Sequence, residues 1–428
     1  MIIKPAKNIS GTLKLPGDKS ISHRAAMFAA MADGRSVIEN FAQSADCSST
    51  LSCLARLGTE ISRDGATVTI DGVGKRGFSR PIGPLDCGNS GTTMRLLAGI
   101  LAGFGIEAFL IGDGSLSSRP MKRVIEPLAA MGAIITSDSG HAPLEIVGGQ
   151  ILSGCLHTLN IASAQIKSCI ILAGLNATGR TTVIEPTPTR DHTERMLQWF
   201  GVDVDTSTSG QISIDGGQSL RASSFVVPGD ISSAAFFLVA AACFDHSDLT
   251  IRNVGINPSR TGIIDILRRC GVSLSIEHER TICNEPVGDL RVRGPVRPSS
   301  GRSVISGDVI ANAIDEIPVL AVLGTQLTGG LEIRDAGELR FKESDRIMAV
   351  VTNLRQMGAD VEERPDGMII GNSRLIGSTV DSFGDHRIAM AFAIAGLFAD
   401  GETEIVGADC VDISFPGFFE TLESVVTS

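Results

Sequence analysis

The chain has 428 residues, 43% of them hydrophobic and 20% charged, which is enough for two ordinary globular domains. Its 37 basic and 48 acidic residues give a net charge of −11, so most of its surface should repel nucleic acid and anionic membranes. The nine cysteines form no C-x-x-C pair, which argues against a zinc site and predicts reduced thiols in the cytoplasm. No signal-peptide core is present, and the longest apolar run, Ala234–Phe244, is about half a membrane span.

A helix-ending pattern recurs along the chain: Leu-x-x-apolar-Gly, followed at once by the start of an apolar strand. Glycine adopts the left-handed conformation that closes a helix, so each copy predicts a helix that turns directly into a strand. The copies are Leu54–Ile61, Leu128–Ile135, Leu197–Val204, Leu267–Leu274 and Leu354–Val361. A sixth helix, without the glycine, is expected near Phe418–Val426. One copy alone could be a common helix stop, but their even spacing predicts a repeat.

A second element alternates with the first: a helix of small apolar residues, then a polar turn and a β-rich run. These helices are apolar on nearly every side and should be buried, whereas Arg190–Phe200 and Lys342–Met357 are amphipathic and should lie outside. The copies begin at SISHRAAM, SGTTMRLL, SAQIKSCI, DISSAAFF, DEIPVLAV and DHRIAMAF. Three lie before about Phe225 and three after it. This division predicts two pseudo-threefold α/β domains better than it predicts a solenoid.

Seven basic residues lie in the first turns of predicted helices or in turns bounded by Gly, Ser or Pro, and four of them, Lys19, Arg24, Arg95 and Arg387, lie near the starts of buried helices. A cation there opposes the helix dipole, so it is expected only where an anion sits beside it. Arginine suits such a site because its planar fork binds phosphate and carboxylate bidentately. The set is Lys19, Arg24, Arg95, Arg119, Lys342, Arg346 and Arg387. Brought together in one cleft, these residues could hold two phosphates and further carboxylates.

The segment PGDKS is close to a nucleotide phosphate loop but lacks two of its requirements. Asp18 separates Gly17 from Lys19, and Thr12 stands where the loop needs another glycine. The segment therefore does not predict ATP hydrolysis.

Two acidic residues near these helix starts have a possible use in catalysis. Asp315 and Glu343 could act as a pair, one taking a proton from a hydroxyl and the other shuttling a proton. Each could equally be a salt-bridge partner, and His386 beside Asp385 could be catalytic or purely structural. The polar residues that start the fourth buried helix, Asp230-Ile231-Ser232-Ser233, are interpreted as helix caps.

Taken together, these segments resemble the 3-phosphoshikimate 1-carboxyvinyltransferases, or EPSP synthases. The segments that carry the resemblance, in chain order, are LPGDKSISHRA, GNSGTTMRLLAG, SSRPMKRVIEPL, SAQIKSCIILAGL, TRDHTERM, PGDISSAAFFLVAA, DEIPVLAV, FKESDRI, GDHRIAMAFAIAG and SFPGFFE. They span the whole chain, and as a set they are highly specific.

The resemblance implies two inside-out α/β barrel domains, each of three βαββαβ repeats with buried central helices. Residues 14–225 would form the first lobe and residues 1–13 with 226–428 the second, with the active site in the cleft between them. The implied reaction transfers the enolpyruvyl group of phosphoenolpyruvate to the 5-hydroxyl of shikimate 3-phosphate and releases phosphate. It needs no metal and no organic cofactor, and we expect a cytoplasmic monomer with no nucleic-acid or membrane partner.

The resemblance also implies roles for individual residues of this chain. Asp315 would be the base for the 5-hydroxyl, and Glu343, with Lys342 beside it, the proton-transfer group at C3 of phosphoenolpyruvate. The residues implied to bind shikimate 3-phosphate are Lys19, Ser20, Arg24, Ser163, Ala164, Gln165, Arg190, Asp315 and Lys342. Those implied to bind phosphoenolpyruvate are Lys19, Asn89, Gly91, Thr92, Arg119, Gln165, Arg346 and Arg387.

The chain departs from the common family pattern in three places. Leu96 follows the turn arginine where many members have proline, and Ala164 replaces the second serine of their Ser-Ser-Gln motif. Many members also have a lysine shortly before the last Pro-containing motif, where this chain has Ile413. These features resemble the subgroup that includes glyphosate-tolerant enzymes, although Gly91 is kept. The missing lysine removes one expected contact to the phosphate of phosphoenolpyruvate.

Two alternatives remain open from the sequence. UDP-N-acetylglucosamine enolpyruvyl transferases share this fold and donor, but they carry Lys-Asn at the position of Lys19-Ser20. They also place a catalytic cysteine in the loop that reads GDGSLSSRP here. The other alternative is an anion-binding relative without catalysis, and the presence of both Asp315 and Glu343 argues against it.

Overall fold

Two compact units make up the computed structural model, which describes residues 1–297 and 301–427. The first lobe contains Gly17–Val227 with Ile282–Glu285, and the second contains Met1–Pro16, Pro228–Thr281 and Pro286–Ser428. The main segment of the first lobe begins at residue 17 and ends at residue 227, against the expected 14 and 225. The shift has local causes, because Pro16 O accepts from Asp230 N in the second lobe, and Val227 N donates to Glu39 O in the first.

The tip of a hairpin belongs to the first lobe although its strands belong to the second, a detail the sequence did not suggest. His192 Nδ1 lies 2.8 Å from Glu285 Oε1, and both side chains are 2% exposed. Arg195 Nη1 donates to Asn284 O at 3.0 Å. These buried contacts fix residues 282–285 in the first lobe.

Within the first lobe, the described residues form three four-stranded sheets with one shared topology. In each sheet the first two strands pair in parallel and the rest are antiparallel. The strand orders are β14(Phe225–Val226)-β3(Asp33–Glu39)-β5(Thr67–Val73)-β4(Glu60–Asp64), β6(Leu85–Asp86)-β7(Ala108–Ile111)-β9(His141–Ile146)-β8(Ile135–Asp138) and β10(Leu156–Thr158)-β11(Arg180–Ile184)-β13(Gln211–Asp215)-β12(Val204–Asp205).

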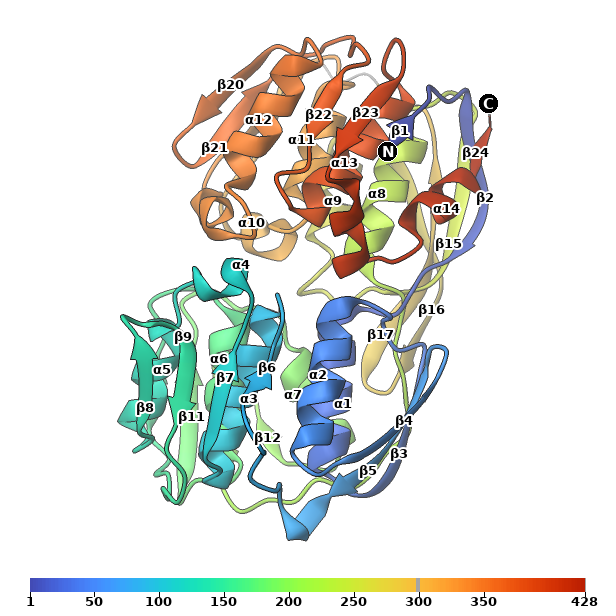
Figure 1. Ribbon diagram of the computed structural model, residues 1–428. Coiled ribbons are helices and arrows are strands. Elements are labelled where there is room, and N and C mark those ends of the chain that lie inside the picture. Colours follow the sequence, from blue (N-terminus) through green and yellow to red (C-terminus); the bar gives the residue numbers. More distant parts are fainter. Residues whose placement is uncertain (298–300, 428) are drawn as a thin grey trace. The chain divides into compact units, whose positions relative to one another are not determined.

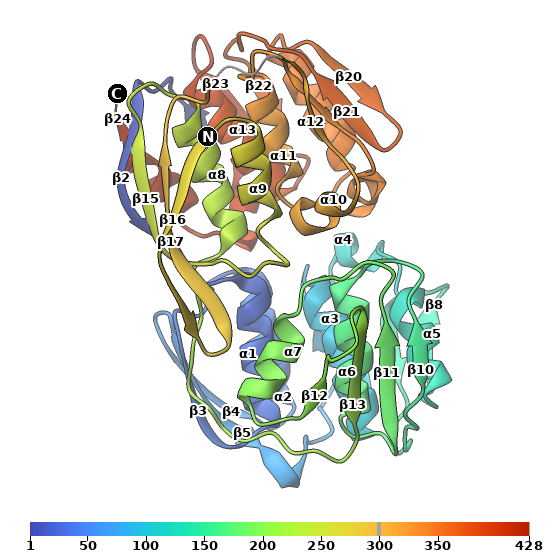
Figure 2. The same ribbon diagram turned by 180° about the vertical axis from the view of Figure 1, so that it is seen from behind.

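The helices of the first lobe divide into a buried set and an outer set, as the sequence predicts. The buried helices are α1(Lys19–Met31), α3(Gly91–Phe104) and α6(Ala164–Gly174). The amphipathic helices are α2(Ala45–Arg56), α5(Lys122–Ala130) and α7(His192–Trp199), and the short elements are η1(Gly74–Arg76) and α4(Gly114–Ser117). The sheets surround the buried helices (Figures 1 and 2), so this lobe is an α/β unit turned inside out.

The second lobe repeats this plan in its described residues. Its sheets are β16(Ser273–Ile282)-β17(Glu285–Arg293)-β15(Asp248–Gly255)-β2(Asn8–Lys14)-β24(Val426–Thr427), β18(Ser303–Ile305)-β19(Leu331–Ile333)-β21(Gly367–Ile370)-β20(Val361–Arg364) and β1(Ile2–Ile3)-β23(Thr403–Val406)-β22(Thr379–Asp381). The helices are α8(Ile231–Ala242), α11(Ile317–Gly324) and α13(His386–Leu397), which are buried, and α9(Gly262–Arg269), α12(Arg346–Gln356) and α14(Phe418–Glu423). The short elements are α10(Asp308–Ala313), η2(Gly337–Phe341) and η3(Ala408–Ile413).

The order of elements inside a repeat corrects the expected βαββαβ. The chain runs β6, α3, β7, α5, β8, β9, which is βαβαββ, and the next repeat runs β10, α6, β11, α7, β12, β13. The helix-ending glycines explain this order. All five have positive φ, from 79° at Gly358 to 102° at Gly132, and each turns an outer helix directly into the next edge strand.

Small residues let the buried helices α3 and α6 approach each other closely. A Cβ atom at Gly99 of α3 would lie 2.2 Å from Cys169 O of α6, and one at Gly103 would lie 2.9 Å from Ala173 O. A larger residue at Gly99 would push the two helices apart. The same packing brings the starts of these helices together.

A buried chain of hydroxyl groups joins the beginnings of α1, α2 and α3. His23 Nδ1 lies 2.7 Å from Thr50 Oγ1, which lies 2.6 Å from Thr93 Oγ1, and Thr93 Oγ1 donates to Ser90 Oγ at 2.7 Å. His23 Nε2 is buried with no hydrogen-bond partner among the described residues. Burial lowers the pKa of His23 to about 3, so the ring is neutral in the folded protein.

We predict that His23 makes stability depend on pH below its ordinary pKa of 6.5. Below pH 6.5, His23 binds a proton in the unfolded chain but not in the folded chain, so the free energy of unfolding falls as pH falls. Between pH 6.5 and 5 the loss from this group is about 2 kcal/mol. Urea unfolding of wild type and His23→Asn at pH 7.5, 6 and 5 measures it, and the variant should lose less. His246→Asn, at an exposed histidine, is the control, and equal slopes in all three proteins would contradict the prediction.

Candidate active site

The buried helices of the first lobe begin with capping side chains, as their sequences predict. Asp18 accepts from Ile21 N, Ser90 from Thr93 N and Ser163 from Ile166 N. Each cap satisfies one of the N–H groups that a helix start leaves without a partner. Lys19 in the first turn of α1 pairs with Asp46 of α2, with 2.9 Å between Nζ and Oδ2.

Gln165 of α6 is held between two residues of α3. Arg95 Nη1 donates to Gln165 Oε1 at 2.6 Å, and Gln165 Nε2 donates to Thr92 Oγ1 at 2.9 Å. Two predicted binding residues, Thr92 and Gln165, therefore meet directly. Arg95, which belongs to the predicted basic set but was assigned to neither substrate, sets the orientation of the amide.

Asn89, Gly91 and Arg119 also come together at the start of α3. Arg119 Nη2 donates to Asn89 Oδ1 at 2.8 Å, and Asn89 Nδ2 donates to Asp113 Oδ2 at 2.8 Å. A Cβ atom on Gly91 would lie 2.6 Å from Arg95 Nη1 and 3.5 Å from Arg119 Nη1. A side chain at position 91 would therefore displace the end of the Arg95 side chain, whereas its distance from Arg119 is an ordinary contact.

Arg24 lies in the second turn of α1 and is 3% exposed. Its burial lowers its pKa to about 10, the charge of Glu194 opposes that shift, and the charge of nearby Arg190 adds to it. Arg190 thus lies near enough to Arg24 for the two charges to repel each other, although the charges of Glu194, Asp18 and Glu285 act in the opposite direction. The structure thus groups the predicted residues Arg24 and Arg190.

In the second lobe, three cations surround Asp315, which lies in the turn between α10 and α11. Lys342 Nζ is 3.6 Å and Arg346 Nη1 3.5 Å from Asp315 Oδ1, and Arg387 Nη2 is 3.8 Å from Oδ2. Arg387 Nη1 also donates to Asp315 O at 2.9 Å. These charges stabilise the carboxylate form that a general base requires.

Arg346 is the most heavily paired cation of this cluster. Its Nη2 lies 2.7 Å from Glu343 Oε2, its Nε lies 2.7 Å from Asp385 Oδ2, and its side chain is 1% exposed. Burial alone would lower the pKa of Arg346, but the charges of Asp385 and Glu343 raise it above its ordinary value. Glu343, Asp315 and Arg346 therefore form one connected group, as a shared site requires.

The two clusters differ in how their cations are balanced. In the first lobe, Arg24, Arg95 and Arg119 donate to neutral oxygens of hydroxyl, amide or backbone groups. In the second lobe the cations face carboxylates, including the buried Asp385 and Glu316. The arginines of the two clusters therefore differ in the groups that orient them, although Lys19 of the first lobe also faces a carboxylate, that of Asp46.

Several residues of these clusters escaped the sequence analysis. Ser232, expected to be a simple cap, instead donates to Glu316 and accepts from Arg260 Nη2 at 2.6 Å, while Asp230 is the cap. Arg260 is 3% exposed and Glu316 1%. The sequence held one indication that Glu316 belongs to this cluster, namely its position directly after Asp315. Its burial could not be predicted, because it depends on contacts distant in sequence. His386 is 2% exposed at the start of α13, and its role stays open.

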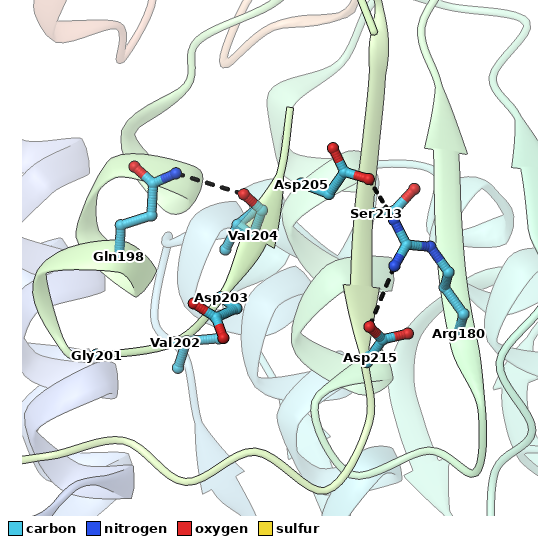
Figure 3. A pocket seen from close by; sticks show the side chains of 9 residues that line it. All are labelled: Arg180, Gln198, Gly201, Val202, Asp203, Val204, Asp205, Ser213 and Asp215. Atoms are coloured by element: carbon cyan, nitrogen blue, oxygen red, sulfur yellow. Dashed lines mark hydrogen bonds and ion pairs between the residues drawn. The ribbon is translucent and has the colours of Figure 1, made fainter. Parts of the chain in front are cut away.

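A separate pocket of about 450 Å³ lies on the sheet formed by β10–β13 and contains none of the predicted site residues (Figure 3). Arg180 is held there between Asp205 and Asp215, and Asp203 adds a further acidic group. Because the single cation is already paired, this pocket does not suit an anion. Among the described residues, no group of three or more His, Cys, Asp or Glu side chains could hold a metal ion, and no helix is long and apolar enough to cross a membrane.

The fold and the two clusters define a class of protein: two inside-out α/β lobes with arginines and carboxylates clustered near their helix starts. Comparison with known proteins identifies the family. The EPSP synthase (3-phosphoshikimate 1-carboxyvinyltransferase) family model matches residues 3–422. The 3-phosphoshikimate 1-carboxyvinyltransferase of Brevibacillus brevis is 51% identical over 99% of both chains, and that of Citrifermentans bemidjiense is 49% identical over 99% of this chain and 98% of its own. The structure of EPSP synthase from Acinetobacter baumannii matches with a TM-score of 0.89 at 43% identity, covering 100% of this chain and 98% of its own.

The chain therefore belongs to the EPSP synthase family of 3-phosphoshikimate 1-carboxyvinyltransferases, which are enolpyruvyl transferases. The resemblance inferred from the sequence motifs and the inside-out α/β fold class are both confirmed.

The ion pair between Arg346 and Asp385 yields a stability prediction. Asp385→Asn keeps the size of the side chain and its ability to cap α13, but removes one of the two carboxylates that lie 2.7 Å from the buried Arg346. We expect the free energy of unfolding to fall by about 3–5 kcal/mol, the usual result of breaking one side of a buried pair. Urea unfolding measures the loss. Asp400→Asn is the control, because its pair with Arg374 is exposed and should contribute less than about 1 kcal/mol. A loss no larger than that of the control would contradict a structural role for the pair.

Proposed function

We propose that the two clusters together carry out the reaction of the family: transfer of the enolpyruvyl group of phosphoenolpyruvate to the 5-hydroxyl of shikimate 3-phosphate, with release of phosphate. This step belongs to the biosynthesis of chorismate and the aromatic amino acids. The observation that carries the proposal is the acid pair Asp315 and Glu343, joined through the single buried cation Arg346. A protein that only bound anions would gain nothing from two carboxylates placed among its cations.

The first lobe supplies most of the binding in this proposal. Lys19, Ser20, Arg24, Ser163, Gln165 and Arg190 bind shikimate 3-phosphate, with Ala164 beside them. Asn89, Gly91, Thr92 and Arg119 receive phosphoenolpyruvate at the start of α3, where free N–H groups and the helix dipole favour an anion. Arg119 and Arg24 are suited to these ligands because each guanidinium can donate two parallel hydrogen bonds.

The second lobe supplies the proton transfers. Asp315 accepts the proton of the 5-hydroxyl as its oxygen bonds to C2 of phosphoenolpyruvate, while Glu343 delivers a proton to C3. The tetrahedral adduct then loses a C3 proton to Glu343 and expels phosphate from C2, which restores the double bond. The departing phosphate takes the proton that Asp315 accepted, so both acids return to their starting protonation states. Lys342, Arg346 and Arg387 bind the carboxylate and phosphate oxygens and stabilise the charge that builds up during addition and elimination.

We also propose that the protein acts as a monomer in the cytoplasm. Its nine cysteines are all free thiols, which agrees with a reducing compartment.

Phosphate release separates this proposal from the sugar-nucleotide alternative. We expect the purified protein to release phosphate from phosphoenolpyruvate when shikimate 3-phosphate is the acceptor, and not when UDP-N-acetylglucosamine is. Each acceptor without phosphoenolpyruvate is the blank. Release with the sugar nucleotide alone would overturn the proposed acceptor, and release with neither would support the non-catalytic alternative.

Glu343→Gln tests the acid–base role directly. The amide keeps the shape of the side chain but cannot exchange a proton with C3, so kcat should fall by about 10²- to 10⁴-fold. Calorimetric binding of shikimate 3-phosphate should change little, because the variant keeps the binding groups of the first lobe. Glu338→Gln, at an exposed glutamate of the neighbouring η2, is the matched control. A variant with wild-type kcat would remove Glu343 from the mechanism.

A further inference from the structure

The guanidinium of Arg24 is held by two hydroxyl groups that come from other helices. Its Nε donates to Thr193 Oγ1 of α7 at 2.7 Å, and its Nη2 donates to Ser168 Oγ of α6 at 2.9 Å. Its Nη1 donates to Ser20 O at 2.9 Å. Thr193 and Ser168 are 1% and 0% exposed, so these two hydroxyl groups are closed to solvent. Residues of α1, α6 and α7 thus fix the plane of one side chain.

The direction of each hydrogen bond in this group can be assigned. Ser168 Oγ donates its one hydrogen to Ala164 O at 2.6 Å. The 2.7 Å contact between Ser168 and Thr193 must then have Thr193 as the donor. Thr193 Oγ1 is left to accept from Arg24 Nε, and Ser168 Oγ to accept from Nη2. Every hydroxyl hydrogen has an acceptor, so the group is ordered without any ligand.

The count of donors shows what remains for a ligand. A guanidinium has five N–H bonds, and the three hydrogen bonds of Arg24 leave one on each Nη atom. In the part of the chain that the structure describes, no carboxylate forms an ion pair with Arg24. The N–H groups that remain on the two Nη atoms of this cation can bind an oxyanion such as a phosphate.

The choice of hydroxyls over a carboxylate has a physical consequence. An acidic residue at position 193 would orient the guanidinium equally well, but it would also neutralise the charge that the ligand needs. The nearest acid, Glu194, is instead paired with the buried Lys167 at 2.7 Å, and Lys167 also pairs with Glu185 at 3.0 Å. Arg24 is therefore oriented by neutral groups and keeps its charge.

We propose that Thr193 and Ser168 are positioning residues that fix the Arg24 guanidinium for the phosphate group of shikimate 3-phosphate. Neither residue touches the ligand itself, and both act through Arg24. The proposal rests on the proposed function, because it takes shikimate 3-phosphate as the ligand of Arg24.

Thr193→Val removes the hydroxyl and keeps the shape of the side chain. The KM for shikimate 3-phosphate should rise about 10- to 100-fold, the scale of one hydrogen bond to a charged group. The KM for phosphoenolpyruvate should change by less than about threefold, because that substrate is assigned to α3. Thr193→Ser restores the hydroxyl and should return the KM for shikimate 3-phosphate to within about threefold of wild type.

Two controls separate positioning from a general loss of structure. Thr181→Val is matched, because Thr181 is a fully buried threonine of the same lobe whose hydroxyl has no hydrogen-bond partner among the described residues. It should leave both KM values unchanged. In an Arg24→Gln background, Thr193→Val should add no further rise in the KM for shikimate 3-phosphate. An equal rise in both KM values, or an additive effect in that background, would overturn the proposal.

Calorimetric binding of shikimate 3-phosphate separates this proposal from the proposed function. A wild-type protein that binds the ligand more tightly than Thr193→Val, but releases no phosphate with phosphoenolpyruvate, would contradict the function and support the positioning role. Equal binding and turnover in wild type and Thr193→Val would overturn the positioning role alone. A wild type that does not bind the ligand would overturn both.

Discussion

The burial of the helices α1, α3, α6, α8, α11 and α13 is the constraint on which the rest of the structure depends. A helix that is apolar on every side must be covered on every side, and only a ring of sheets and outer helices covers three such helices at once. Close packing then requires small residues, as where Gly99 meets Cys169. Because the helices pack so tightly, their polar first turns are brought into direct contact.

The contacts between helix starts differ between the lobes, because the cations have different kinds of partner in each. In the first lobe, Arg24 and Arg95 of two helices reach to Ser168 and Gln165 of a third, all through neutral groups. In the second lobe, Arg387 reaches across to the backbone of Asp315. A cation oriented by a neutral oxygen is not neutralised by that partner, whereas a cation between carboxylates is balanced by them and orients them. Binding and proton transfer therefore call for different partners around the same kind of side chain.

The sequence predicted what depends on local pattern, and it missed what depends on distant contacts. The five helix-ending glycines and the apolar helices follow from spacing and conformational preference, and all were found where expected. The buried pair of Arg346 with Asp385 spans 39 residues, and the bond from Arg24 to Thr193 spans 169. No periodicity encodes such a pairing. Ser232 shows the limit most clearly, because its sequence fits a cap while its hydroxyl bridges Arg260 and Glu316.

The bridge at Ser232 also helps to fix the turn that carries Asp315. The backbone carbonyl of Asp315 accepts from Arg387, and its neighbour Glu316 is buried and accepts from Ser232. Both restraints act on the backbone or on the adjacent residue, while the carboxylate of Asp315 faces Lys342, Arg346 and Arg387 at 3.5 to 3.8 Å. A buried serine distant in sequence therefore helps to position a predicted site residue through the residue next to it.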